Sequence, residues 1–287
     1  MKLSGCNTLI TGGSQGLGRV IVEAFLAEGA NVVFCARTAV DVAQTQSALN
    51  SQLNTGQQFV GLTCDVADPT SVAALFARAA QLGPLHVVVN NAGIYGPIGP
   101  TEDVALTDWM QAWQVNVTGT LLVCQQAIRA MKPQRAGKII TISGGGATNP
   151  MPRFAAYAAT KAAVVRLTET LAEEYRTDRI DINAVAPGAL RTRLTAQVLA
   201  LGPEKAGVEF FAKNKKWSEG GAVDPKLAAS LCVFLASAAS DGITGKLISA
   251  QWDPWKHPEQ FRSLATGDVY TLRRIIPEDR PKKISPP

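Results

Sequence analysis

Short apolar runs alternate with longer mixed stretches along most of the chain, and this alternation predicts an α/β protein. Seven runs have the apolar character of buried strands: residues 8–11, 31–35, 59–64, 85–90, 138–142, 180–185 and 246–249. The stretches between them have the length and spacing of helices: residues 19–28, 39–53, 71–81, 115–131 and the segment around Tyr157. Because the strands are apolar on both faces, we expect a single doubly wound parallel seven-stranded sheet flanked by helices.

No internal repeat and no linker divides the first part of the chain, so residues 1–250 should form one domain. The remainder, residues 251–287, departs from the alternation and contains Trp252, Trp255, several prolines and a charged run from Arg273 to Lys283. This extension is either an arm packed over the domain surface or an element that closes a functional site or reaches a neighbouring subunit.

Composition narrows the classes of function. The chain has 287 residues, of which 46% are hydrophobic and 18% charged, so it can bury a large core. The net charge of +5 is modest, and basic residues are scattered except between Lys213 and Lys216, so we expect no nucleic-acid partner. No apolar stretch reaches the roughly 20 residues that a membrane span needs, and no leader precedes the first apolar run.

Cysteine and histidine usage gives no indication of a metal site. Two histidines are too few for a metal cluster or a His-based triad. Five cysteines lie in apolar runs without the spacing of metal ligands: Cys6, Cys35, Cys64, Cys124 and Cys232. Such cysteines are typical of small core residues in a reducing compartment. We therefore expect no bound metal and a soluble, cytoplasmic protein.

A glycine-rich turn, TGGSQGLG over residues 11–18, follows the first predicted strand and opens the first predicted helix. Glycines permit a tight turn and let backbone N–H groups approach a pyrophosphate, whose charge is favoured at a helix N-terminus. A glycine pattern alone is a weak signal, but after an N-terminal strand it strongly indicates dinucleotide binding. The expected cofactor contacts in this turn are Gly12, Ser14, Gln15, Gly16, Leu17 and Gly18.

The end of the second predicted strand indicates which dinucleotide binds. An acidic residue there would hold the ribose 2′-hydroxyl of NAD, but residues 35–38 read CART, with no carboxylate. Arg37 can instead pair with a 2′-phosphate through its planar guanidinium, so we favour NADP(H), with NAD(H) as the alternative. An ordinary surface arginine is the other interpretation. Asp65, with Val66 beside it, follows the third strand and is placed to meet the adenine amino group.

Tyr157 and Lys161 stand four residues apart in an alanine-rich segment, so both side chains leave the same face of one helix. A phenol normally loses its proton only near about pH 10, which makes it a poor acid or base at neutral pH. A lysine cation one turn away favours the phenolate and should lower the Tyr157 pKa. The spacing by itself is a weak signal, since any long helix can carry it by chance.

Five motifs in this order resemble the short-chain dehydrogenases/reductases, a family of Rossmann-type NAD(P)-dependent oxidoreductases. They are the glycine turn, residues 90–93 (NNAG) after the fourth strand, Asn116 in a long helix, the Tyr157–Lys161 pair, and Pro187-Gly188 followed by Thr192. The resemblance covers about residues 2–249. It implies that Tyr157 is the general acid/base, that Lys161 binds the nicotinamide ribose and lowers the Tyr157 pKa, and that Asn116 holds a water in the proton relay.

The resemblance also implies further contacts and a lid. Pro187, Gly188 and Thr192 would lie near the carboxamide or pyrophosphate of the cofactor, and residues 90–93 would line its adenosine side, through Asn90, Asn91, Ala92 and Gly93. A substrate lid is expected over about residues 191–224. Basic and aromatic residues alternate in this lid and just before the Tyr157 helix: Arg153, Arg193, Phe210, Phe211, Lys213, Lys215, Lys216 and Trp217.

One position departs from the family pattern. The family places a serine at the end of the fifth strand to hydrogen-bond the substrate oxygen, commonly the second of a Ser-Ser pair, whereas this chain has Ser143-Gly144. Either Ser143 takes that role or Gly144 occupies the position and the hydroxyl is missing. We favour Ser143. Loss of one such donor typically reduces the rate about a hundredfold or more.

These observations favour an NADP(H)-dependent oxidoreductase that interconverts a ketone and a secondary alcohol. The basic lid suits a polar substrate such as a sugar, a cyclitol or a nucleotide-linked metabolite, although its charges equally suit a solvated helix. The alternatives are a reductase of apolar, ketoacyl-type ketones and a catalytically inactive nucleotide-binding regulatory protein.

The family resemblance also implies assembly into dimers or tetramers through two helices. Each of them, residues 115–131 and 157–175, carries apolar residues that we assign to an outer face: Leu121, Leu122, Ile128 and Met131 on one, Val164, Val165, Leu167 and Leu171 on the other.

Overall fold

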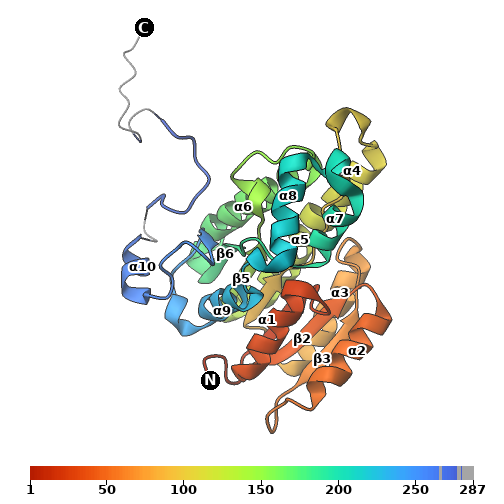
Figure 1. The fold of residues 1–287 in the computed structure, drawn as a ribbon. Coiled ribbons are helices and arrows are strands. Elements are labelled where there is room, and N and C mark those ends of the chain that lie inside the picture. The colour runs from red at the N-terminus through yellow and green to blue at the C-terminus, as the bar shows by residue number, and fades with distance from the viewer. Residues whose placement is uncertain (265–266, 277–278, 280–287) are drawn as a thin grey trace.

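The computed structural model describes residues 1–264, 267–276 and 279, and a parallel sheet forms its centre (Figure 1). The seven strands lie in the order β3-β2-β1-β4-β5-β6-β7, and every neighbouring pair is parallel. This confirms the predicted doubly wound sheet. The bounds are β1 Asn7–Thr11, β2 Asn31–Ala36, β3 Phe59–Thr63, β4 Val87–Asn90, β5 Gly137–Ile142, β6 Ile180–Ala186 and β7 Leu247–Ser249.

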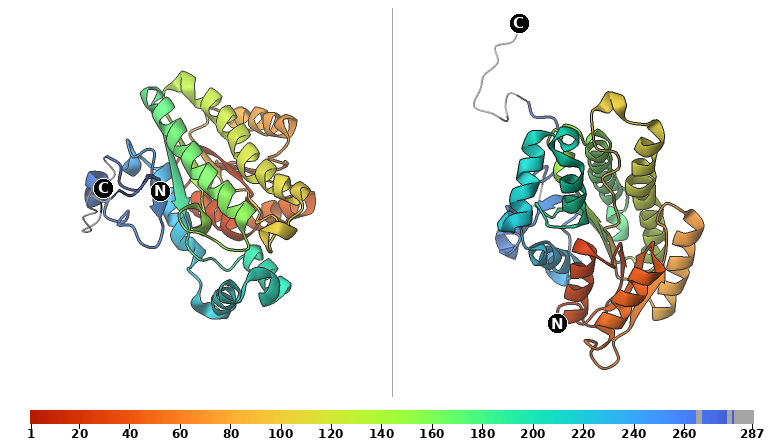
Figure 2. Two further views of the ribbon diagram at one scale, coloured as in Figure 1. Left: turned by 90° about the horizontal axis from the view of Figure 1, so that it is seen from above. Right: turned by 45° about the vertical axis from the view of Figure 1, so that its right-hand side comes forward.

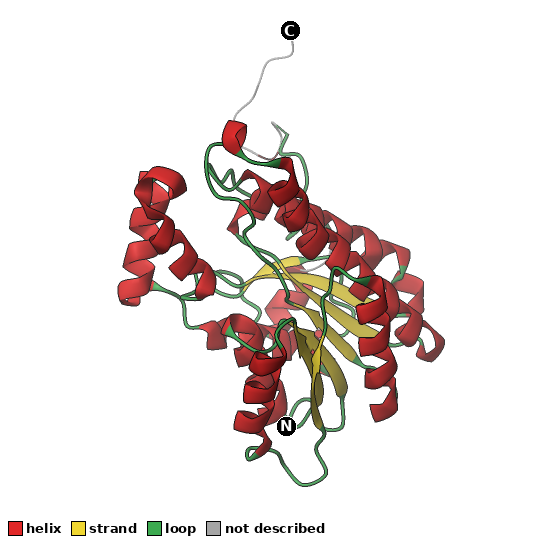
Figure 3. Ribbon diagram, turned by 90° about the vertical axis from the view of Figure 1, so that its right-hand side faces the viewer, coloured by secondary structure: helices red, strands yellow, loops and turns green. Residues whose placement is uncertain are grey.

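Alternate residues of each strand enter separate cores on the two faces of the sheet, which explains why the strands are apolar throughout. In β2, Val32 and Phe34 belong to one core, and Val33 and Cys35 belong to the other. Helices α1 (Gly16–Ala27), α2 (Ala39–Asn50) and α9 (Pro225–Ala236) complete the first core, and α3 (Pro69–Ala79), α5 (Gly119–Met131) and α6 (Ala155–Glu174) complete the second. Figure 3 shows the strands between these two layers of helices.

The helix expected over residues 115–131 begins earlier and is interrupted. Helix α4 (Leu106–Trp113) leads into a π-helical turn, Gln114–Thr118, before α5 starts. The apolar pattern missed α4 because most of it faces solvent, with Leu106 73% and Met110 47% exposed. Helix α2 is shorter than predicted and ends at Asn50, since Leu49 is its last residue in the core.

Two helices stand apart from the layers and fill most of the range expected to form a lid: α7 (Arg193–Ala206) and α8 (Val208–Lys216). They lie side by side, in teal in Figures 1 and 2. Gly202, with φ of 76°, breaks α7 just before Pro203. Gly207, with φ of 83°, turns the chain into α8. Both breaks use the left-handed backbone that glycine adopts readily.

The chain after β7 packs against its own domain. Trp255 and Phe261 are buried, and each ring centroid lies 6.1 Å from that of Phe234 in α9. Phe261 belongs to the short helix α10 (Pro258–Leu264), and residues 267–272 then pass along β7. Part of the charged run that ends at Lys283 lies outside the described residues.

No helix in the described part of the chain is long and apolar enough to cross a membrane. The five cysteines are free, and all except Cys6 are buried, as expected for small core residues. The cytoplasmic location stays a prediction.

Candidate active site

The turn between β1 and α1 is shaped by close backbone contacts. Gly12 and Gly16 have positive φ angles of 65° and 56°. A Cβ atom at Gly18 would lie 2.0 Å from the Gly12 carbonyl oxygen, so no side chain fits there. Asn91 Nδ2 donates hydrogen bonds to the carbonyl oxygens of Thr11 (3.0 Å) and Gly12 (3.1 Å). These constraints fix the backbone around the N-terminus of α1.

No side chain in the described part of the chain caps this N-terminus, although Gln15 Nε2 donates a hydrogen bond to Asp41 Oδ2 (3.5 Å). The Ser14 hydroxyl oxygen is buried without a hydrogen bond to any described residue. The first turn of α1 contains no acidic residue. Because a helix N-terminus with unsatisfied N–H groups and no carboxylate attracts phosphate, this donor set fits the pyrophosphate of a dinucleotide.

Residues 90–93 are held to β1. The Thr11 hydroxyl oxygen accepts hydrogen bonds from the backbone N–H groups of Asn91 and Ala92, both at 3.0 Å. Asn90 is buried and donates through Nδ2 to the Thr120 carbonyl oxygen (3.0 Å). Asn90 therefore joins β4 to α5, while Asn91 and Gly93 line the cavity described below.

The residues predicted to select the cofactor lie at the ends of β2 and β3, which are neighbours in the sheet. Arg37 is exposed and forms no hydrogen bond or ion pair with another described residue. Asp65 is also exposed, and its Oδ1 accepts a hydrogen bond from the Ala67 N–H (3.0 Å). The side chain of Val66 is buried against Gly119, so only its backbone faces outward to a ligand.

Three of the four predicted catalytic residues converge beside the end of β5. Lys161 Nζ donates to the Ile142 carbonyl oxygen at 2.8 Å, which fixes α6 over this strand end. Asn116 Nδ2 donates to the Ile94 carbonyl oxygen and to Thr160 Oγ1, both at 2.9 Å. A Cβ atom at Gly93 would lie 3.2 Å from Asn116 Oδ1 and 3.4 Å from Lys161 Nζ, so both side chains meet at this glycine.

The π turn explains how Asn116 reaches this position. An extra residue in one turn re-aims the side chain at that point of the helix, and such turns occur often at functional sites. Asn116 Oδ1 also accepts a hydrogen bond from the Ile94 N–H at 2.9 Å. Because both Nδ2 donors and Oδ1 are hydrogen-bonded, Asn116 joins the loop after β4 to α6.

Burial is the main cause of the pKa shifts of both Tyr157 and Lys161. Burial, with a smaller contribution from neighbouring Tyr95, raises the Tyr157 pKa, the opposite of the direction expected from Lys161 alone. Burial also lowers the pKa of Lys161 to about 8, which weakens its cationic influence on the phenol. The Tyr95 ring stands edge-on to Tyr157 with centroids 4.7 Å apart, so it removes water from one side of the phenol.

The fourth predicted catalytic residue, Ser143, lines the same cavity. Its hydroxyl oxygen is buried and has no hydrogen-bond partner in the described part of the chain. At the next residue, a Cβ atom on Gly144 would lie 2.2 Å from the Tyr157 hydroxyl oxygen. Position 144 therefore carries no side chain in this arrangement because the phenol occupies that space.

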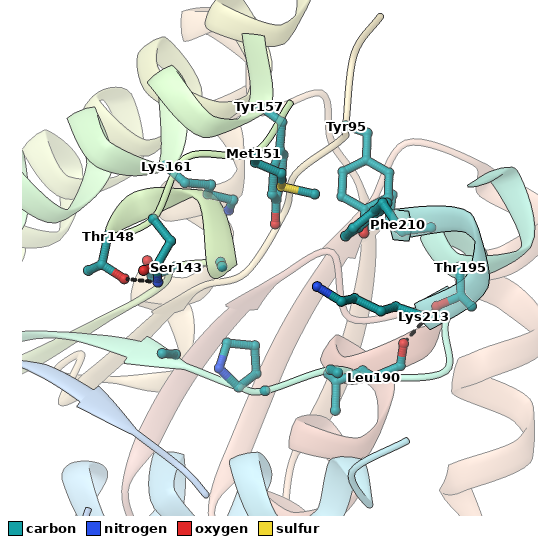
Figure 4. A pocket seen from close by; sticks show the side chains of 18 of the residues that line it. Tyr95, Ser143, Thr148, Met151, Tyr157, Lys161, Leu190, Thr195, Phe210 and Lys213 are labelled. Atoms are coloured by element: carbon teal, nitrogen blue, oxygen red, sulfur yellow. Dashed lines mark hydrogen bonds between the residues drawn. The ribbon is translucent and has the colours of Figure 1, made fainter. Parts of the chain in front are cut away.

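A cavity of about 1220 Å³ lies between the strand ends and the lid. Figure 4 shows Tyr157, Lys161 and Ser143 on one side, and Lys213 reaching into the cavity from α8. Nine of the predicted catalytic and cofactor-binding residues line it: Leu17, Asn91, Gly93, Ser143, Tyr157, Lys161, Pro187, Gly188 and Thr192. The other predicted catalytic and cofactor-binding residues lie outside this lining: Gly12, Ser14, Gln15, Gly16, Gly18, Arg37, Asp65, Val66, Asn90, Ala92 and Asn116.

Sequence patterns missed several residues of the cavity. Tyr95 and Met151 come from loops after β4 and β5. Trp252, Asp253 and Tyr270 come from the C-terminal extension, for which closure of a functional site was one of the two interpretations, without any residue assigned to the cavity. The described residues include no group of three or more His, Cys, Asp or Glu side chains arranged to hold a metal ion.

The buried Lys161 gives a prediction about pH. Between pH 8 and the ordinary lysine pKa of 10.5, Lys161 is neutral in the folded protein and protonated in the unfolded chain. The free energy of unfolding therefore rises with pH in this window, whereas below pH 8 the cost of burying the ammonium is fully present. Between pH 8 and 10.5, the free energy of unfolding of the unmodified protein should rise by about 3 kcal/mol more than that of Lys161→Met, as measured by urea unfolding. A difference that stays constant with pH would contradict this assignment.

Comparison with known proteins identifies the family of the chain. Residues 7–200 match the family model of the short chain dehydrogenases. The chain is 32% identical over 247 residues to D-threitol dehydrogenase of Mycolicibacterium smegmatis, covering 85% of this chain and 90% of that protein. It is 35% identical over 246 residues to 3-alpha-(or 20-beta)-hydroxysteroid dehydrogenase of Mycobacterium bovis, covering 85% and 87%. The crystal structure of levodione reductase has a TM-score of 0.79 at 25% identity, covering 86% of this chain and 96% of that chain. The chain thus belongs to the short-chain dehydrogenase/reductase family, oxidoreductases that act on alcohols and carbonyl compounds with a nicotinamide cofactor.

Proposed function

We propose that this protein is an NADP(H)-dependent oxidoreductase that interconverts a ketone and a secondary alcohol. The observation that carries the proposal is the convergence of Tyr157, Lys161 and Ser143 on one cavity, beside a helix N-terminus that suits a pyrophosphate. A bound nicotinamide supplies or accepts the hydride at the substrate carbon.

The chain's own residues handle the proton. In the reducing direction, Tyr157 Oη donates its proton to the oxygen that becomes the alcohol hydroxyl, and in the oxidising direction it removes that proton. Ser143 Oγ, which has no partner among the described residues, is available to hydrogen-bond the same oxygen. The Lys161 ammonium donates one hydrogen bond to Ile142, so its other N–H groups are free for cofactor hydroxyls.

Asn116 positions other residues in this mechanism. Its side chain joins the loop after β4 to α6. Its backbone carbonyl oxygen accepts a hydrogen bond from Thr120 Oγ1 (2.7 Å). This oxygen and the side-chain Oδ1 each accept a hydrogen bond and have a second lone pair, so a relay water could bind Asn116 through either of them.

The preference for NADP(H) rests on Arg37. Its guanidinium is exposed at the end of β2 and has no acidic partner among the described residues, so it is free to pair with a 2′-phosphate. The alternative, NAD(H), would use the same glycine turn without this contact.

The cavity lining supports a polar substrate such as a sugar, a cyclitol or a nucleotide-linked metabolite. Lys213 reaches into the cavity from α8 (Figure 4). Arg153 lines the cavity from the loop before α6. Tyr95, Phe210 and Trp217 form an apolar stretch of the same lining, which favours a reductase of apolar ketones as the second candidate. The relatives act on both kinds of compound, since their names include D-threitol and hydroxysteroids.

A third candidate is a nucleotide-binding regulatory protein without turnover. Gly144 favours it, because the hydroxyl that the family places beside the tyrosine is absent at that position. The two classes differ in one observable: the regulatory protein would bind NADPH tightly and consume none of it with any ketone.

Catalysis is tested with two variants. Tyr157→Phe should bind NADPH normally and lose nearly all turnover, because phenylalanine has no hydroxyl group to move the proton. Ser143→Ala should reduce turnover about a hundredfold with NADPH binding unchanged. Cofactor absorbance with a panel of ketones measures the rates. Wild-type activity in Tyr157→Phe would refute the mechanism, and an unchanged rate in Ser143→Ala would remove Ser143 from it.

Cofactor choice is tested at Arg37. NADPH should bind more tightly than NADH to the unmodified protein, and Arg37→Ala should erase much of that difference. Lys2→Ala, at an exposed residue before β1 and therefore at the opposite end of the parallel strands from Arg37, serves as the control and should leave both affinities unchanged. Titration calorimetry gives the dissociation constants, and equal affinities in the unmodified protein would contradict the preference.

We also propose a homodimer or homotetramer, although the apolar outer face is smaller than expected. Ile128, Met131, Val164, Val165 and Leu171 are buried within their own chain. Leu121, Leu122 and Leu167 are half-buried, and exposed Leu106 and Met110 add apolar surface on α4. Light scattering should give a multiple of the chain mass, and Leu121→Arg should lower it. A monomeric unmodified protein would contradict the proposal.

A further inference from the structure

One wall of the cavity comes from the C-terminal segment, which we define as residues 251–272. Trp252, Asp253 and Tyr270 line the same cavity as Tyr157 and Lys161. The Trp252 side chain is 78% exposed, and the Tyr270 ring stacks on Phe261 with centroids 5.7 Å apart. Large aromatic surfaces therefore border the space in which the substrate reacts.

The segment is bound to the outer edge of the sheet. The Leu247 N–H donates a hydrogen bond to the Tyr270 carbonyl oxygen at 2.8 Å, so the segment pairs with β7 where the sheet would otherwise end. Lys246 is buried, and its Nζ donates to the carbonyl oxygens of Gly267 (2.7 Å) and Val269 (3.0 Å). Three hydrogen bonds from two adjacent residues thus hold the backbone on both sides of Val269.

A second attachment joins the segment to the helix that carries Tyr157. Glu169 Oε1, from α6, accepts a hydrogen bond from the Leu272 N–H at 2.6 Å. The Arg166 guanidinium, also from α6, donates to the Leu272 carbonyl oxygen. Tyr270, between the two attachments, has a φ of 62°, a conformation that a tyrosine rarely adopts without such constraints.

We propose that the C-terminal segment is a substrate-specificity element supplied by the same chain. Trp252 and Tyr270 contact the part of the substrate remote from its carbonyl group, and their flat rings suit a cyclic or otherwise extended carbon skeleton. Lys246 and Glu169 are positioning residues that hold this wall against the sheet edge and α6. The inference rests on the proposed function, since it takes the reaction to occur in this cavity.

The test compares ketones of graded size with NADPH as the reductant. Trp252→Ala and Tyr270→Ala should change the ratio of kcat/KM for 2-decalone to that for acetone by about tenfold or more, chiefly through KM. Lys246→Met should change the ratio in the same direction while kcat for acetone is kept. Val269→Ala is the matched control, because its side chain is 45% exposed and lies outside the cavity lining. All four variants should bind NADPH like the unmodified protein.

A ratio that stays within about twofold of the unmodified protein in both wall variants would overturn the proposal. A second measurement does not depend on turnover. In Trp252→Cys, saturating NADPH and 2-decalone should slow alkylation of the new thiol by iodoacetamide, whereas Val269→Cys should react at the same rate with and without them. If the ligands slow alkylation equally at positions 252 and 269, or at neither position, the result contradicts the proposal that the C-terminal segment lines the substrate site. An unmodified protein that reduces no ketone would refute the proposed function, and the alkylation result would still decide where the segment lies.

Discussion

The burial of Lys161 is the constraint on which the rest of the site depends. An ammonium group removed from water needs hydrogen bonds in return, and Lys161 obtains one from the Ile142 carbonyl oxygen at the end of β5. That bond ties α6 to the end of β5. Tyr157, one turn earlier on α6, lies directly against Gly144. Lowering the Lys161 pKa to about 8 is the consequence of the same burial.

The parallel sheet brings the remaining groups to this point. The loops after β1, β4, β5 and β6 all leave from the carboxyl ends of their strands, so residues far apart in sequence meet at one edge. Thr11 joins the first two of these loops through its hydroxyl oxygen. The sheet also leaves an outer edge at β7, and pairing of that edge with the Tyr270 backbone brings the C-terminal segment to the cavity.

Much of this arrangement could be predicted because it is local in the sequence. A strand covered on both faces must be apolar throughout, and a turn that approaches its own helix must use glycine, as at Gly18. Helix α4 was missed because its apolar residues, such as Leu106, are exposed and do not form the periodic apolar face of a helix that packs on the core. Tyr95 was missed, and Tyr270 was expected only as part of a packed extension, because no local pattern reports a contact that only the folded chain creates.

Two expectations changed for physical reasons. The sequence argument for a lower Tyr157 pKa counted the Lys161 charge and left out burial, which acts on both groups and dominates in the structure. The apolar outer face assigned to α5 and α6 was too wide, since Met131 and Val165 face their own core. In both cases the residue types were right, and the missing information was how deeply each side chain is buried.

Transfer of isotope from the cofactor tests the central claim most directly. The protein would be incubated with NADPH that carries deuterium at C4 of the nicotinamide, on either face, together with the ketone panel, and the product alcohols analysed by mass spectrometry. The account predicts deuterium on the carbinol carbon from one face of the nicotinamide only. The account would be contradicted if neither labelled cofactor gave a deuterated product. It would also be contradicted if NADPH bound and no ketone were reduced.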